Sequence, residues 1–291
     1  MTRGSPPDDL LALVRAALEE DAPQGDLTSE VVLQPGTGCA AELIAKDTGV
    51  IAGIRSMEAV FAEVSMQDGT HVAIDVKTPD GSPVSPGDLI ARIQGVAATV
   101  LRGERPSINL LSHLSGVATL TRAFVDAAEP ATILCTRKTT PGLRKLEREA
   151  VLAGGGSLHR GSLSDAILIK DNHVQLAGGV GPAVRRAVDH GVPVEVEVET
   201  LDQLEEAIAA GADRFLLDNP TPELVGEAIR RLGGHERLEV SGGVTLDNVG
   251  SFVDAGARTI SVGRLTHSST ALDLSLEITD TIHPEAGDGD G

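Results

Sequence analysis

Aromatic residues are almost absent from this chain of 291 residues, which has four Phe and neither Trp nor Tyr. Basic charge is also scarce, and the net charge at pH 7 is −19. Proteins that bind nucleic acids usually present a basic surface, and they use aromatic platforms for unpaired bases. We therefore expect no nucleic-acid partner. The same negative charge disfavours binding to an anionic membrane surface.

Cysteines and long apolar runs are scarce as well. Cys39 and Cys135 could form at most one disulfide, and two reduced thiols in a cytoplasmic protein are the favoured interpretation. No segment approaches the roughly 20 apolar residues that a membrane-spanning helix needs. The N-terminal apolar run is short and Arg15 interrupts it, so it is unlike a secretion signal. We expect a cytoplasmic protein with no membrane partner.

Helical periodicity marks the first part of the chain at residues 8–20 and 102–125. After residue 130, short apolar runs alternate with helical stretches, an order that predicts βαβ units and a parallel sheet. We expect a TIM-like α/β barrel shortened to six or seven strands, with a doubly wound open sheet as the alternative. The predicted strands are Thr132–Cys135, Ala166–Ile169, Val194–Val198, Phe215–Leu217, Leu238–Val240 and Thr259–Val262, and the predicted helices include 201–211, 221–233 and 245–256.

Basic residues follow the first two predicted barrel strands. In such barrels the active site forms at the C-terminal strand ends, where Arg137, Lys138 and Lys170 lie. Residues 137–173 carry seven Lys or Arg against four acids, unlike the rest of this acidic chain. This excess predicts a small, strongly anionic substrate, which arginine grips with paired hydrogen bonds. Three of the basic residues are interpreted as a solvated helix face: Arg144, Lys145 and Arg148.

Glycines follow the fifth and sixth predicted strands. Ser241, Gly242 and Gly243 precede a predicted helix, and Gly263 follows the next strand. Glycines let a ligand approach the backbone, and a helix N-terminus offers free N–H groups. The location matches the phosphate site in the last loops of many barrels.

Two acids stand on adjacent predicted strands among these basic residues. Glu197 and Asp218 suit Mg²⁺, which takes one or two carboxylates while bridging phosphates. Alternatively they pair with Lys138 and Lys170, and the two interpretations are compatible. No His/Cys cluster of the kind that binds zinc is visible.

Several motifs extend these observations. They are GERPSINLLSHLSGVATLT (103–121), TRKTTPGLRKLE (136–147), HRGSLSDAILIKDNH (159–173), VEVEVET (194–200), LLDN (216–219), SGGVTLDNV (241–249) and SVGRLTHS (261–268). In order and spacing the chain resembles the quinolinate phosphoribosyltransferases, decarboxylating enzymes of NAD synthesis, over nearly its whole length.

The resemblance implies an organisation and an activity. It implies an N-terminal α/β sandwich domain (1–113), a barrel with the catalytic site (114–268), and a C-terminal helix that returns to the first domain before a disordered acidic tail (269–291). Phosphoribosyl would pass from PRPP to quinolinate with Mg²⁺ and loss of CO₂, giving nicotinate mononucleotide and pyrophosphate. A homodimer would share its sites, with Arg105 contributed by the partner.

The resemblance also implies roles for residues. Quinolinate would be bound by Arg105, Thr136, Arg137, His159, Arg160 and Lys170. PRPP and its phosphates would be bound by Lys138, Ser241, Gly242, Gly243, Gly263, Arg264 and His267. The catalytic residues would be Lys138, Lys170, Glu197 and Asp218, and Mg²⁺ would lie at Glu197 and Asp218.

Three positions depart from the family pattern. Cys135 stands where Asp is usual, Leu158 where Asn is usual, and Ser162 where Gly is usual. A related branch, associated with molybdate transport, acts on another aromatic acid and lacks the full IKDNH stretch, so residues 169–173 favour quinolinate. Two rivals remain: a barrel lyase that forms a Schiff base on Lys138 or Lys170, and a non-catalytic protein that keeps the fold.

Overall fold

The computed structural model describes residues 7–283 and divides the chain into two compact units. One unit comprises the chain up to Thr119 together with the segment from Thr270 onward, and the other is Leu120–Ser269. Helix α4 (Ala97–Ala127) contributes residues to both units. The boundary expected after residue 113 also falls inside this helix. The acidic tail expected at the C-terminus begins at residue 284 and lies outside the described residues.

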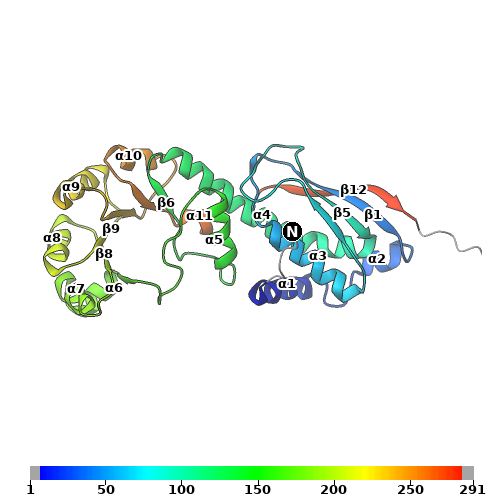
Figure 1. Ribbon diagram of the computed structural model, residues 1–291, viewed down its shortest axis with the longest axis horizontal. Coiled ribbons are helices and arrows are strands. Elements are labelled where there is room, and N and C mark those ends of the chain that lie inside the picture. Colours follow the sequence, from blue (N-terminus) through cyan, green and yellow to red (C-terminus); the bar gives the residue numbers. More distant parts are fainter. Residues whose placement is uncertain (1–6, 284–291) are drawn as a thin grey trace, which may run out of the picture. The chain divides into compact units, whose positions relative to one another are not determined.

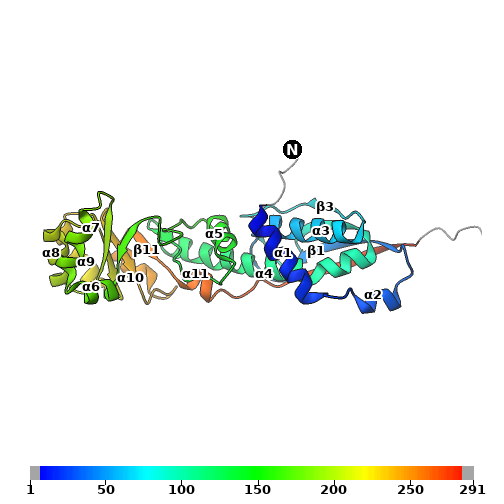
Figure 2. The ribbon, with the colours of Figure 1, turned by 90° about the horizontal axis from the view of Figure 1, so that it is seen from below.

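The first unit is a four-stranded antiparallel sheet with helices packed against it. The strand order is β12-β1-β5-β3, and Figure 1 shows helices α3 and α4 together on one side of this sheet. Helices α1 and α3 lie side by side (Figure 2). The elements are α1 (Asp8–Asp21), α2 (Leu27–Val32), β1 (Gly38–Ala45), β2 (Gly49–Val50), α3 (Ile54–Asp68), β3 (Ala73–Val76), β4 (Pro83–Val84), β5 (Leu89–Val96) and β12 (Leu274–Ile282).

The core of this unit is aliphatic, as the composition requires. Leu43 and Ile93 from the sheet meet Phe61 of α3 and Leu111 of α4, all at most 2 % exposed. Burying such side chains contributes about 1.5–3 kcal/mol each.

The expectation of a C-terminal helix after residue 268 is wrong. Residues Leu274–Ile282 form strand β12, which pairs antiparallel with β1 along its length, from Gly38 opposite Ile282 to Ala45 opposite Leu274. The segment LSLEITDTI alternates apolar and polar residues and is rich in β-branched side chains, a pattern typical of strands. Pairing with β12 also covers one edge of β1, which an α-helix could not do with backbone hydrogen bonds.

The second unit is a six-stranded parallel sheet with helices on its outside (Figure 1). All six predicted strands are present at the predicted places. The strands are β6 (Thr132–Leu134), β7 (Ile167–Ile169), β8 (Val194–Val198), β9 (Arg214–Asp218), β10 (Leu238–Ser241) and β11 (Thr259–Ser261). The helices are α5 (Arg144–Ala153), α6 (Asp171–Ala177), α7 (Val180–Val188), α8 (Leu201–Ala210), α9 (Pro222–Leu232), α10 (Val249–Asp254) and α11 (Arg264–His267).

The strand order identifies a shortened barrel. It runs β6-β11-β10-β9-β8-β7, so the first strand of the unit pairs with the last. A doubly wound sheet would reverse its order at an internal switch point, and none occurs here. The seam lies between β6 and β7. Ser157 lies beside β6 at this seam, where its N–H donates to Ile133 O and its own O accepts from Cys135 N.

Helix ends in the barrel follow ordinary capping chemistry. The side chains of Thr200 and Thr221 accept hydrogen bonds from Gln203 N and Leu224 N at the starts of α8 and α9. Both helices end on a left-handed glycine, Gly211 and Gly233.

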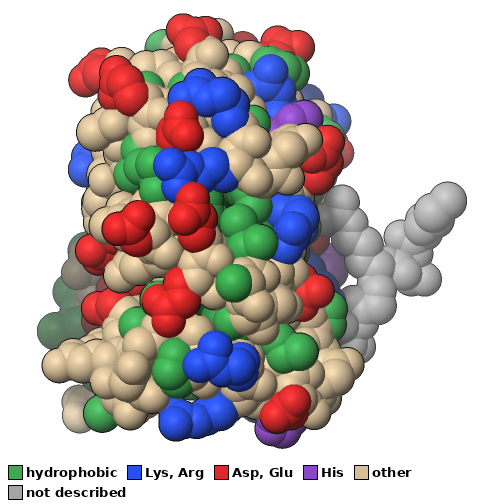
Figure 3. All heavy atoms as spheres, turned by 90° about the vertical axis from the view of Figure 1, so that its left-hand side faces the viewer, with side chains coloured by type: hydrophobic (Ala, Val, Ile, Leu, Met, Phe, Trp, Pro, Cys, Tyr) green, Lys and Arg blue, Asp and Glu red, His purple; other side chains and the backbone are tan. Residues whose placement is uncertain are grey.

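The outer surface mixes charges of both signs. On the side of the barrel unit shown in Figure 3, acidic and basic side chains are interspersed with no broad basic patch. Ion pairs such as Arg231 with Glu205 join neighbouring helices. In the described part of the chain, no helix is both long and apolar enough to cross a membrane.

Candidate active site

A cavity of about 680 Å³ opens at the C-terminal ends of the barrel strands. Every strand or the loop after it contributes side chains, because parallel strands end at the same rim. The lining residues are Thr136, Arg137, Lys138, His159, Arg160, Leu168, Lys170, Glu197, Leu216, Asp218, Glu239, Ser241, Gly242, Gly243, Val244, Thr245, Ser261, Gly263, Arg264 and His267.

Arg137 and Arg160 form a basic wall of this cavity. Among the described residues, none accepts a hydrogen bond from the buried Arg137 Nε, and an unpaired buried donor is costly, so this site suits an anionic acceptor. Burial, and then the charge of Arg137, lower the pKa of Arg160. Two guanidinium groups held together in this way repel each other, and an anion between them would relieve that repulsion.

Acidic groups and a lysine occupy another part of the cavity. Lys170 forms an ion pair with Glu197. Burial, and then the charge of Glu197, raise the pKa of Asp218, while Lys170 lowers it. The charge of Glu197 therefore disfavours the ionised form of Asp218. A divalent cation between them would stabilise both charges, so this pair of oxygen donors fits Mg²⁺.

The loop after β10 has a backbone that only glycine adopts easily. Gly242 has φ +83°, and an ideal Cβ there would lie 2.7 Å from Asp218 Oδ1. The next helix, α10, begins only at Val249. The cavity is therefore lined by the loop from Gly242 to Thr245, and the expected helix N-terminus lies farther along the chain.

Gly263 creates space between two basic side chains. An ideal Cβ on it would lie 3.1 Å from Lys138 Cδ and 3.2 Å from His267 Nε2. Arg264 follows in α11 and also lines the cavity. The position thus offers a small space beside three basic groups, as a phosphate requires.

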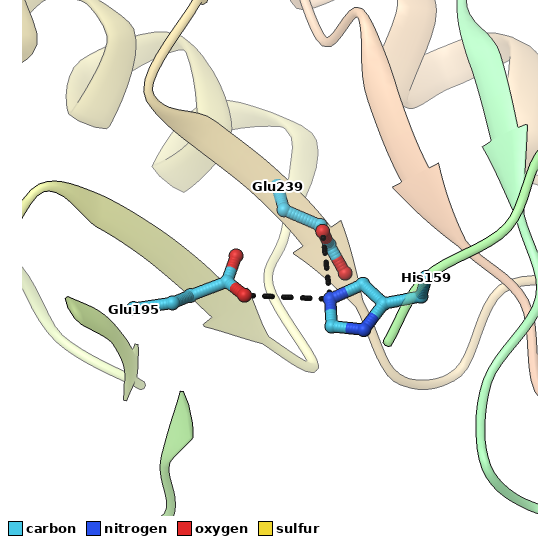
Figure 4. Close-up of side chains that lie close together, drawn as sticks. All are labelled: His159, Glu195 and Glu239. Atoms are coloured by element: carbon cyan, nitrogen blue, oxygen red, sulfur yellow. Dashed lines mark ion pairs between the residues drawn. The ribbon is translucent and has the colours of Figure 1, made fainter. Parts of the chain in front are cut away.

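His159 lies between two carboxylates at the floor of the cavity. Its Nε2 is 3.3 Å from Glu195 Oε2 and 3.4 Å from Glu239 Oε2, as Figure 4 shows. Glu239 is 1 % exposed and also accepts a hydrogen bond from Ser261 Oγ. Hydrogen bonding to Glu195, and then to Glu239, raises the pKa of His159 to about 9.

A backbone contact opposes this protonation. The N–H of Arg160 donates to His159 Nδ1 at 2.8 Å, which requires a lone pair on that nitrogen. The pKa of His159 is nevertheless raised, because two nearby carboxylates act on Nε2 and only one neutral donor acts on Nδ1. In the neutral ring the proton stays on Nε2, directed at the carboxylates, and protonation of Nδ1 breaks the bond from Arg160 N.

The cavity brings together nearly all the residues predicted from the sequence. Arg105 is the exception: it lies on α4 in the first unit, is not among the lining residues, and its nearest acid is Glu104 at 3.8 Å. Sequence reasoning assigned no role to Glu195 or Glu239. Glu239 lies within the mostly apolar strand segment LEVS, and a buried charge needs a partner. Its position was therefore the available signal that Glu239 pairs with another side chain.

The three departures from the family pattern do not line the cavity. Cys135 is fully buried behind it. Leu158 is 38 % exposed. Ser162 is turned to Asp165, to which its hydroxyl donates a hydrogen bond. None of the three is therefore placed to change the contacts of a ligand in the cavity directly.

The interpretation of Arg144 and Arg148 as a solvated helix face is wrong, whereas Lys145 is exposed as expected. Arg144 donates to the backbone oxygens of Arg137 and Gly161, and Arg148 donates to that of His159. The two arginines lie one helical turn apart on α5. They point inward because the loops that they contact carry free carbonyl oxygens there.

Fold and site together define an α/β-barrel protein with a cavity suited to a small molecule that carries several negative charges. Comparison with known families places it more closely. The family model for the quinolinate phosphoribosyl transferase C-terminal domain matches residues 117–277, and the model for the N-terminal domain matches residues 26–115. The chain belongs to the quinolinate phosphoribosyl transferase family.

Individual relatives agree. The probable nicotinate-nucleotide pyrophosphorylase [carboxylating] of Bacillus subtilis is 43 % identical over 265 residues, covering 89 % of this chain and 90 % of the relative. Quinolinate phosphoribosyltransferase [decarboxylating] 1b of Nicotiana tabacum is 38 % identical, and the match covers 97 % of this chain and 86 % of the relative. The crystal structure of NadC from Streptococcus pyogenes is 36 % identical in sequence and matches with a TM-score of 0.87. The match covers 96 % of this chain and 100 % of that one.

Proposed function

We propose that this protein transfers phosphoribosyl from PRPP to quinolinate with loss of CO₂, giving nicotinate mononucleotide and pyrophosphate. The observation that carries the proposal is the buried, unpartnered Nε of Arg137 beside the charge-repelled guanidinium of Arg160. Two adjacent guanidinium groups match two adjacent carboxylates on one ring. The names of the relatives give the same activity for those proteins.

The ring substrate lies, in this proposal, at the basic wall of the cavity. Arg137 and Arg160 bind its carboxylates, with Thr136 and His159 beside them and Lys170 across the cavity. The three family departures make no direct contact with a ligand at this wall, because none of them lines the cavity. That favours quinolinate over another aromatic acid.

PRPP takes the part of the cavity where the glycine loops lie. Ser241, Gly242 and Gly243 receive one phosphate group, while Gly263, Arg264 and His267 lie beside Lys138. Glu197 and Asp218 would hold Mg²⁺, and the ion would supply positive charge to neutralise the departing pyrophosphate.

The protein's own residues mainly position and neutralise. The pyridine nitrogen attacks the ribose carbon, the bond from that carbon to pyrophosphate breaks, and positive charge develops on the sugar. Lys138 stabilises the leaving oxygens, and the carboxylates of Glu197 and Asp218 stabilise the sugar cation. The ring nitrogen then becomes cationic, so the neighbouring carboxylate leaves as CO₂ and the ring carbon takes a proton from water. No nucleophilic side chain is needed, and holding the two substrates together supplies much of the rate.

The assembly is a homodimer in which Arg105 of one protomer completes the site of the other. The exposure of Arg105 supports this: its side chain, on α4 in the first unit, is 59 % exposed. A cytoplasmic location is supported by the two buried cysteines, which are both free thiols. No nucleic-acid or membrane partner enters the proposal.

Turnover with a panel of pyridine acids tests the function. The protein is incubated with PRPP and Mg²⁺, and with quinolinate, nicotinate or no acid, and nucleotide is followed by chromatography. Nucleotide from quinolinate alone is expected, and EDTA abolishes it. A protein that binds PRPP but forms no nucleotide from quinolinate contradicts the proposal and directs the search to other aromatic acids.

Arg105→Ala tests the shared site. On its own, this variant is expected to lose most activity. Mixed with an inactive Arg137→Ala variant, it is expected to regain activity, because one site of the mixed dimer then has both arginines intact. Two inactive proteins that stay inactive after exchange of protomers contradict the sharing of Arg105.

A further inference from the structure

We propose that Arg144 and Arg148 are positioning residues that hold the two loops of the basic wall at the spacing a ring dicarboxylate needs. These loops carry Arg137 on one side, and His159 with Arg160 on the other. The inference rests on the proposed function, because it assumes that a dicarboxylate binds between the loops. It gives a role to two charged side chains that the reaction itself does not use.

Arg144 joins the two loops through one guanidinium group. Its Nε donates to Thr139 Oγ1 at 2.9 Å, and its Nη2 lies 3.4 Å from Arg137 O, both on the loop after β6. Its Nη1 donates to Gly161 O at 3.3 Å on the other loop. Because a guanidinium is planar and rigid, these contacts fix the distance between the loops.

Arg148 supports the second loop one helical turn farther along α5. Its Nη1 donates to His159 O at 2.9 Å and lies 4.0 Å from Cys135 Sγ. Between the two arginines, the buried Glu147 accepts a hydrogen bond from Thr140 N at 3.1 Å. Three residues on one helix face thus contact the backbone of both loops.

Gly161 shows how close this contact is. An ideal Cβ at this position would lie 3.2 Å from Arg148 Cζ and 3.3 Å from Asp165 Oδ2. Asp165 in turn accepts hydrogen bonds from Gly161 N and Ser162 N, which closes the loop on itself. The guanidinium of Arg148 therefore packs directly on the backbone beside Arg160.

The phosphate side of the cavity has its own support. Lys138 O accepts a hydrogen bond from Thr266 Oγ1 at 2.7 Å, and Thr266 belongs to α11. In the described part of the chain, the hydrogen bonds of Arg144 and Arg148 go to the loops of the basic wall and not to the loops that carry Gly242 and Gly263. Loosening the contacts of α5 should therefore reduce the affinity for the dicarboxylate and leave that for PRPP nearly unchanged.

The test compares the variants Arg144→Gln and Arg148→Gln with a matched control, Arg230→Gln. Arg230 is exposed on the outer surface of α9 and pairs with Glu227. We expect KM for quinolinate to rise about tenfold in each variant and further in the double variant, since displaced binding groups cost this much or more. KM for PRPP should change by less than about twofold. The far-UV circular dichroism spectrum should be the same as that of wild type.

Rescue and a second substitution separate positioning from a purely structural role. Arg148→Lys keeps one donor for His159 O and should recover part of the affinity. Gly161→Ala should raise KM for quinolinate in the same way, because its methyl group displaces the guanidinium of Arg148. If Arg148→Gln does not fold, Arg148→Lys and Gly161→Ala carry the test.

Binding of phthalate keeps the test independent of turnover. Phthalate has two adjacent carboxylates on a ring but no nucleophilic nitrogen, and calorimetry measures its affinity for wild type and variants. Wild type that binds phthalate without turning over quinolinate would sink the proposed function alone. Unchanged affinity for both dicarboxylates in folded Arg144→Gln and Arg148→Gln would overturn the positioning role. A parallel loss of PRPP affinity would overturn it as well.

Discussion

Glu239→Gln should change how the stability of the protein depends on pH. In the folded chain, Glu195 and Glu239 raise the pKa of His159 from 6.5 to about 9. A histidine with a higher pKa in the folded than in the unfolded chain binds its proton more tightly when folded. Its stabilising contribution is therefore complete below about pH 6.5, and it is lost as the pH rises through about 9.

The magnitude follows from the size of this change. One pKa unit corresponds to about 1.4 kcal/mol, so the imidazole contributes up to about 3 kcal/mol at low pH. The hydrogen bond from Arg160 N to Nδ1 works against it, which makes this an upper figure. Glu195 is the larger cause and Glu239 the second. Removing the charge of Glu239 should therefore abolish somewhat less than half of the stabilisation by His159, which is about 1 kcal/mol.

Urea denaturation followed by far-UV circular dichroism measures the effect, because the chain has no Trp for fluorescence. Wild type, Glu239→Gln and the surface control Glu227→Gln are unfolded at several pH values from 6 to 9.5. Other titrating groups cancel in the comparison. As the pH rises across this range, the free energy of unfolding should fall by about 1 kcal/mol more in wild type than in Glu239→Gln. Parallel loss in the two proteins would refute the assigned charge of His159.

Three further outcomes are expected. Gly242→Ala should weaken PRPP binding at least about tenfold by calorimetry, because its Cβ would approach Asp218 at a left-handed φ, whereas Gly250→Ala, in open space, should not. Gly116→Ala should lower the free energy of unfolding by about 2 kcal/mol or more in urea, because its Cβ would meet the backbone oxygen of the segment before β12. Lys170→Met should move the acid limb of the pH–rate profile to higher pH, because Lys170 lowers the pKa of Asp218; an unmoved limb would argue against this.

The barrel was predictable because its signals are local. Strand β9 carries the short apolar run Phe215–Leu217, and helices α8 and α9 begin at capping threonines and end at glycine. For residues 274–282 the family resemblance implied a helix, whereas the alternation of apolar and polar residues in this segment is typical of a strand. Its partner β1 lies more than 200 residues earlier in the chain, so the pairing that decides the matter is not local.

The cavity residues could be predicted because function concentrates at strand ends. Arg137, Lys170 and Asp218 each follow or end a predicted strand. Arg144 and Arg148 could not be found in this way, because a charged residue on an amphipathic helix usually faces solvent. Only the fold shows that two loops approach this face of α5 and supply carbonyl acceptors.

The most direct test of the central claim is the fate of the carboxylate next to the ring nitrogen. Quinolinate labelled at that carboxylate is incubated with PRPP, Mg²⁺ and the protein, and labelled CO₂ and pyrophosphate are measured together. The account predicts equal amounts of the two and neither from the Arg137→Ala variant. Pyrophosphate release without labelled CO₂, or CO₂ release that Arg137→Ala leaves intact, would contradict it.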